Sequence, residues 1–99
     1  PDLPLIIAHG IQERDSAEAY RQFPNVFFDT AADVIPRATI ERFVNRFGAD
    51  RLVFGSDMPR NDPRIPLGAV LAAGISPLDK EKILFRNMAG ILGLQIQKA

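Results

Sequence analysis

The stretch Leu52-Val-Phe-Gly-Ser-Asp-Met-Pro59 most constrains how this chain can fold. Its apolar residues do not alternate with polar ones, as in strands that are buried on both faces, and such strands belong mainly to parallel sheets covered by helices. Leu3–Ala8 and Val26–Asp29 have the same character. With a third strand at Leu52–Ser56, we therefore predict a sheet of three parallel strands.

Helical patterns separate and follow these strands. The clearest one covers Pro36–Phe47, where apolar residues recur at i, i+3, i+4 and i+7 and Gly48 can end the helix. Three further helices are predicted, at Ser16–Phe23, Pro66–Ala73 and Pro77–Leu92. Strands that alternate with helices indicate an α/β fold in which parallel strands are joined by right-handed helical crossovers.

Size and charge exclude several classes of protein. The 99 residues suffice for one small domain, and the 12 basic residues balance the 12 acidic ones. A neutral chain gives no electrostatic reason to expect nucleic acid or an anionic membrane as a partner. No apolar run approaches the roughly 20 residues of a membrane span. Cysteine is absent, which excludes disulfides and thiolate metal sites and favours the cytoplasm.

Polar residues follow each predicted strand, where parallel α/β folds place their working groups. His9 ends the first strand, Asp29 the second, and Asp57 follows the third. Strands one and three would lie about 10 Å apart, two strand spacings, so His9 and Asp57 can reach a common ligand. His9 is then a candidate catalytic acid or base, or a metal ligand, and Asp57 a candidate proton acceptor or metal ligand.

Each of these residues also has a purely structural interpretation. His9 can bond a loop carbonyl, Asp57 can cap a turn, and Asp29 can bond its local backbone. Loop arginines on the same rim are candidate ligands for a substrate carboxylate, although loop arginines are often simply solvated. These are Arg14, Arg60 and Arg64.

The order of these motifs resembles a known family. The blocks are Ile7-Ala8-His9-Gly10, Asn25-Val-Phe-Phe-Asp-Thr30, Phe47-Gly-Ala-Asp-Arg-Leu-Val-Phe-Gly-Ser-Asp-Met-Pro59, and Asp79–Leu84 with Asn87 and Leu92-Gly-Leu94. Together they resemble the C-terminal part of the amidohydrolase-related TIM-barrel proteins, the branch that contains aminocarboxymuconate semialdehyde decarboxylase and related hydrolases, lactonases and decarboxylases. One departure is Ile11, where the family often has a second glycine.

The resemblance implies that residues 1–99 are the C-terminal portion of a single (β/α)8 barrel domain, with its sixth to eighth strands and C-terminal helix. It implies a catalytic role for His9 and a metal-ligand or base role for Asp57. The cofactor would be a divalent metal, zinc, whose other ligands would precede Pro1, because His9 and Asp57 are at most two of the three protein ligands of a catalytic zinc. The expected function is that of a metal-dependent hydrolase or decarboxylase acting on a small carboxylated molecule.

Two other interpretations remain at this point. A three-stranded sheet would leave open apolar edges, which favours a catalytically inactive fragment or a binding module completed by a partner chain. That partner would be the remainder of the barrel or a second copy. A compact flavodoxin-like binding domain is the third possibility, although the chain has no phosphate-binding glycine loop.

Overall fold

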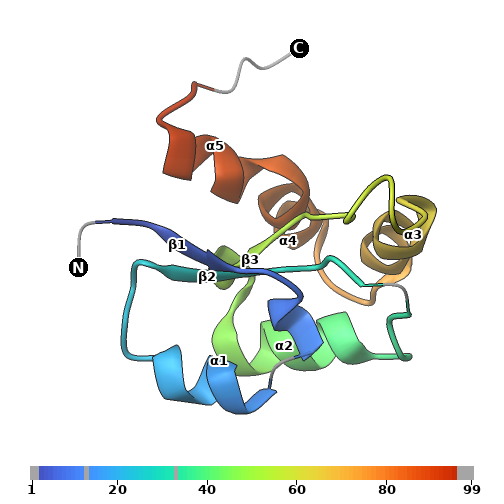
Figure 1. Cartoon of the computed structure of the whole chain (residues 1–99), viewed down its shortest axis with the longest axis horizontal. Coiled ribbons are helices and arrows are strands. Elements are labelled where there is room, and N and C mark those ends of the chain that lie inside the picture. The colour runs from blue at the N-terminus through green and yellow to red at the C-terminus, as the bar shows by residue number, and fades with distance from the viewer. Residues whose placement is uncertain (1–2, 13, 33, 96–99) are drawn as a thin grey trace.

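A three-stranded parallel sheet lies at the centre of the computed structural model, which describes residues 3–12, 14–32 and 34–95 (Figure 1). Its strands are β1 (Leu5–Ile7), β2 (Val26–Asp29) and β3 (Leu52–Val53), paired in the order β1-β2-β3. Ile7 lies opposite Phe28, while the last residue of β2 lies opposite Val53. The predicted parallel α/β sheet, with strands adjacent in sequence order, is confirmed.

Helices connect the strands, and in the view of Figure 1 α1 and α2 lie below the strands while α4 and α5 lie above them. The chain from Pro77 to Leu92 is helical throughout, as predicted, with a π-helical segment in its middle. The elements are η1 (Gly10–Gln12), α1 (Arg14–Tyr20), α2 (Thr39–Phe47), η2 (Ala49–Arg51), α3 (Arg64–Ala72), α4 (Pro77–Glu81), η3 (Lys82–Arg86) and α5 (Asn87–Leu92).

Some predicted boundaries were wrong. Helix α2 begins at Thr39 rather than at Pro36, because Ala38 adopts a left-handed conformation with φ of 66° that a helix cannot include. Helix α3 begins at Arg64, two residues before Pro66, where the Asp62 carboxylate accepts a hydrogen bond from the Arg64 backbone N–H. Helix α1 likewise begins and ends earlier than predicted, at Arg14–Tyr20.

The core joins β2 and β3 to the helices. Phe28 of β2 is 1% exposed and meets Phe43 of α2 edge to face, with ring centroids 5.6 Å apart. The predicted apolar stripe of α2 therefore faces the sheet. On the C-terminal helix, the Asn87 side-chain amide donates to the carbonyls of Ala49 and Leu52, each at 2.7 Å. Ile11, at the departure from the family pattern, is buried in this core.

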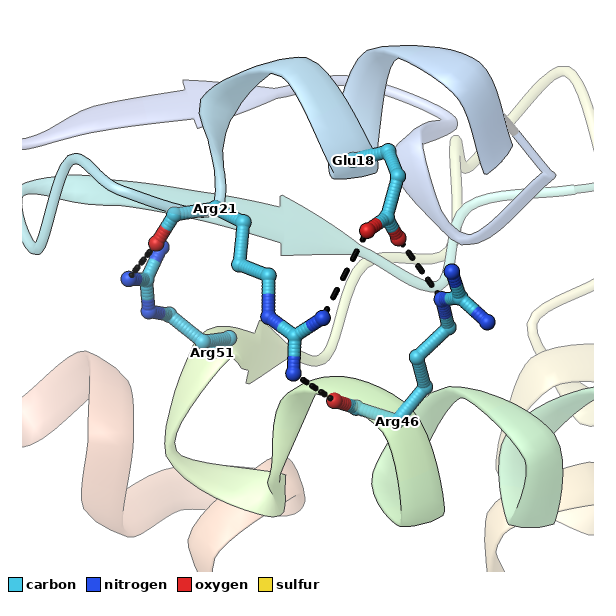
Figure 2. Close-up of polar contacts among 4 residues, drawn as sticks. All are labelled: Glu18, Arg21, Arg46 and Arg51. Carbon is cyan, nitrogen blue, oxygen red and sulfur yellow. Dashed lines mark hydrogen bonds and ion pairs between the residues drawn. The ribbon is translucent and has the colours of Figure 1, made fainter.

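A polar cluster lies at the end of the sheet where β2 and β3 begin (Figure 2). The Arg51 guanidinium donates to the carbonyls of Arg21 and Val26, which lead into and begin β2. The Arg46 guanidinium donates to Glu18 at 2.6 Å, and this hydrogen bond lowers the pKa of the Glu18 carboxyl. The same carboxylate also pairs with Arg21 at 3.4 Å. The cluster thus links the ends of α1 and α2 to the starts of the strands.

The outer edge of the sheet is exposed. Leu5 and Ile6 of β1 are 50% and 40% exposed, whereas Leu52 of β3 is 0% exposed. Among the described residues, no strand pairs with the outer side of β1. The predicted open apolar edge is therefore present at β1.

We expect two glycine substitutions to have opposite effects on stability. A Cβ at Gly10 would lie 2.8 Å from the Cβ of buried Phe28 and 3.1 Å from its Cα, so Gly10→Ala should lower the free energy of unfolding by about 1–3 kcal/mol. The control is Gly68→Ala within α3, where a Cβ meets nothing within 4 Å. It should raise that free energy by about 0.5–1 kcal/mol. Urea denaturation measures both effects. An unchanged free energy of unfolding in Gly10→Ala would contradict the close packing of Gly10 against Phe28.

Candidate active site

The imidazole of His9 and the carboxylate of Asp57 meet at the carboxyl end of the sheet. His9 Nε2 lies 3.6 Å from Asp57 Oδ2, although the two residues follow different strands, β1 and β3. Together with Arg60 and Asn61 they line an open cavity of about 370 Å³. About half of the His9 side chain and a third of the Asp57 side chain remain exposed, which leaves both accessible to a ligand.

Both residues occupy left-handed backbone, with a φ of 59° at each. This conformation costs a non-glycine residue roughly 1–2 kcal/mol, so neighbouring contacts must hold it in place. The strands predicted to reach Ala8 and Ser56 are shorter than expected, because β1 ends at Ile7 and β3 at Val53. The turns after the strands, rather than the strand pleat, direct the two side chains.

Asp29, at the end of the central strand, holds the turn that carries His9. Its Oδ1 accepts hydrogen bonds from the backbone N–H of His9 at 2.7 Å and of Ala31 at 3.1 Å. The bond to Ala31 is the local backbone contact expected for this aspartate, whereas the bond to His9 spans two strands. Its other oxygen would lie 3.0 Å from a Cβ at Gly55, so this glycine leaves room for the carboxylate.

Thr30 holds the chain beyond β3. It is 0% exposed, and its hydroxyl donates to the Gly55 carbonyl at 2.9 Å and accepts from the Gly55 N–H at 3.0 Å. Its own backbone N–H donates to the Val53 carbonyl at 3.1 Å. A side chain therefore replaces the strand ladder at Gly55, which explains why β3 is shorter than predicted.

Asn61 orients Asp57. Its side-chain amide donates to Asp57 Oδ2 at 3.2 Å, and its backbone N–H donates to the Asp57 carbonyl at 3.0 Å. The sequence places Thr30 beside Asp29 at the end of the second predicted strand but assigns no role to it or to Asn61. Asn61 stands in an irregular loop where no periodicity marks it, although its separation of four residues from a candidate carboxylate was a usable signal.

The three candidate arginines differ in their placement. Arg60 lines the cavity beside His9 and Asp57. The Arg64 guanidinium instead donates hydrogen bonds to both carboxylate oxygens of Asp62, with N–O distances of 2.7 to 3.1 Å. The Arg64 side chain is 87% exposed. Arg14 begins α1, and its side chain lies outside the described part of the chain. Only Arg60 is therefore seen at the cavity.

The donor groups suit one side of a zinc site. Zinc accepts imidazole nitrogen and carboxylate oxygen, which His9 and Asp57 present towards each other. Within residues 3–12, 14–32 and 34–95, no cluster of three or more His, Cys, Asp or Glu side chains could hold a metal ion. The described residues thus provide two donor groups, and a full catalytic zinc site would need further ligands.

A second, larger cavity of about 530 Å³ is lined mainly by residues of η1 and α2 and shares no lining residue with the first. Its lining residues include no imidazole or carboxylate, and its cations are Arg42 and Arg46. Because acid–base chemistry requires titratable groups, we take the smaller cavity at the strand ends as the candidate active site.

A parallel α/β fold with titratable groups at the carboxyl ends of its strands is typical of α/β enzymes. A family model described as Amidohydrolase matches residues 1–94, and the chain belongs to this family. No curated protein matches the chain. Among the described residues, no helix has the length and apolar character that crossing a membrane requires.

Solved structures share the fold at low sequence identity. A 2,6-dihydroxybenzoate decarboxylase complexed with 2,6-dihydroxybenzoate is 17% identical with a TM-score of 0.73, and the match covers 92% of this chain and 35% of that one. The Rhizobium enzyme of that name is 18% identical with a TM-score of 0.71, with 92% and 35% covered. An amidohydrolase from Burkholderia multivorans with bound HEPES is 15% identical with a TM-score of 0.64, with 94% and 45% covered. This chain thus spans about a third of the decarboxylases.

We expect the Asp62 carboxyl to titrate well below an ordinary aspartate. The hydrogen bonds from Arg64 lower the pKa of Asp62 from 3.8 to about 2. Its contribution to stability is therefore fully present above pH 3.8 and is lost as the pH falls through about 2. Carbon-detected NMR titration measures this midpoint. Arg64→Gln should return it towards 3.8, and an unchanged midpoint in that variant would contradict the assignment.

Proposed function

We propose that this chain carries one side of the active site of an amidohydrolase-type enzyme that acts on a small carboxylated molecule. The observation that supports this most is the approach of His9 Nε2 to within 3.6 Å of Asp57 Oδ2 at the ends of separate strands. Family membership and the cavity that these residues line with Arg60 add to it.

In this proposal His9 is the catalytic acid or base. A neutral imidazole can take a proton from water or substrate and return it to the leaving group or the reacting carbon. Asp57, oriented by the Asn61 amide, accepts a proton or acts as a metal ligand. A divalent metal, zinc in our proposal, would polarise a bound water or a substrate oxygen.

Arg60 is proposed to bind the substrate carboxylate. Its guanidinium can form two parallel hydrogen bonds to a carboxylate, which fixes orientation as well as charge. Arg60 lies on the wall of the cavity, so a substrate held there would place its reacting atoms beside His9 and Asp57. Arg14 remains a proposed second contact from the same rim.

The reaction is proposed to be hydrolysis or decarboxylation. The structural neighbours include a 2,6-dihydroxybenzoate decarboxylase, whose ligand is a small aromatic carboxylate, and an amidohydrolase. Both reactions need a proton delivered or removed at one atom, which is the role given to His9. We further propose that β1, β2 and β3 are the sixth to eighth strands of a (β/α)8 barrel, whose other strands carry the remaining metal ligands. We propose the cytoplasm as the location of the enzyme.

The exposed edge of β1 supports a second role. Leu5 and Ile6 are exposed there, beside an edge that lacks a strand partner among the described residues. The chain would then be a catalytically inactive binding or structural module completed by the remainder of a barrel or by a second copy. This role predicts that the protein shows no turnover, whether or not His9 and Asp57 are substituted.

We expect His9→Asn and Asp57→Asn each to lower kcat by at least about 100-fold, since each removes an acid–base or ligand group. Asparagine tolerates left-handed backbone, so both variants can keep the local fold. The assay uses small aromatic carboxylates and carboxylated lactones with the zinc-supplemented full-length enzyme, because the chain by itself is expected to be inactive, and circular dichroism monitors folding.

The matched control is Asp50→Asn, because Asp50 is an exposed aspartate that pairs with Lys82 and lies in η2, before the start of β3, whereas the cavity lies beyond the end of that strand. Its kcat should stay within about threefold of the unaltered protein, since exposed ion pairs contribute little. Retained turnover in folded His9→Asn and Asp57→Asn would refute the assignment, whereas absence of turnover in the unaltered protein as well would favour the second role.

A further inference from the structure

The left-handed turn that carries His9 needs an anchor. Its backbone φ is 59°, and the residue before it, Ala8, already lies beyond the end of β1. The His9 N–H therefore has no strand ladder to join, and the bond that it makes instead goes to the Asp29 carboxylate at 2.7 Å. This charged acceptor comes from 20 residues further along the chain.

The Asp29 carboxylate is itself held from two sides. The Ala31 N–H binds the same oxygen as His9 does, at 3.1 Å, and this fixes the side chain against its own loop. On the other side, Gly55 leaves the space into which the carboxylate extends, since an added Cβ would lie 3.0 Å from its Oδ2 and 3.1 Å from its Cγ. Asp29 thus bridges the end of β1 to the chain beyond β3.

We propose that Asp29 is a positioning residue that sets the distance between the His9 imidazole and the Asp57 carboxylate. The inference rests on the proposed function, since it assigns a purpose to that distance. Asp29 contacts the backbone of His9 rather than its ring, so its effect on the reaction passes through the placement of the imidazole. The neighbouring Thr30 binds Gly55, two residues before Asp57, so consecutive residues at the end of β2 hold the chain segments that carry both partners.

The test compares Asp29→Ala, Asp29→Asn and the exposed control Asp50→Asn in the full protein. Asp29→Ala removes the acceptor, so exchange of the His9 backbone amide with solvent should quicken at least about tenfold. The misplaced imidazole should lower kcat about 10- to 100-fold, with KM changed by less than about threefold. Asp29→Asn retains a carbonyl oxygen for the same two N–H groups, so its His9 amide exchange rate and its kcat should stay close to those of the unaltered protein. Asp50→Asn should leave both quantities unchanged.

Gly55→Ala is a second route to the same perturbation. It leaves the carboxylate in the sequence but forces it aside, because the new Cβ would lie 3.0 Å from Asp29 Oδ2. The His9 amide should again exchange faster. If Asp29→Ala does not fold, as judged by circular dichroism, Gly55→Ala and Asp29→Asn decide the question by the same amide readout.

A folded Asp29→Ala variant with unchanged His9 amide exchange would overturn the proposal, even if its kcat fell, because Asp29 would then act elsewhere. Faster exchange with unchanged kcat would overturn it as well, since the position of His9 would not affect the reaction. Failure of the proposed function is recognised separately, by full turnover in His9→Asn.

Discussion

Two consecutive residues at the end of the central strand, Asp29 and Thr30, hold the carboxyl end of the sheet together. The carboxylate of Asp29 binds the backbone of His9, while the buried hydroxyl of Thr30 binds both backbone groups of Gly55. Neither β1 nor β3 extends far enough for ladder hydrogen bonds to do this. The meeting of His9 and Asp57 therefore depends on side chains of the strand between them.

The two ends of the sheet are built differently. At the start of the strands, Arg51 donates to backbone carbonyls and Glu18 pairs with Arg46 (Figure 2). The charged side chains at this end therefore bind other parts of the protein. At the other end, His9 and Arg60 stay exposed around an open cavity. This division matches parallel α/β folds, in which one end of the sheet stabilises and the other carries function.

The sequence was sufficient to predict the parallel sheet, its strand order and the convergence of His9 with Asp57, because unalternating apolar runs and their polar ends are local patterns. It could not predict the long-range bond from Asp29 to His9, because no periodicity encodes it. The left-handed turns were missed because positive φ is uncommon for any residue other than glycine, and no sequence pattern marks it at His9 or Asp57. Arg64 was a reasonable candidate until the structure paired it with Asp62.

NMR mapping of a bound carboxylate tests most directly whether the strand ends form the site. The isotope-labelled protein is titrated with 2,6-dihydroxybenzoate, the ligand of a structural neighbour. We expect the largest amide shifts at the residues lining the smaller cavity, His9, Asp57, Arg60 and Asn61. Shifts confined to the larger cavity, around Thr39 and Arg42, or no shifts at His9 and Asp57, would contradict this assignment.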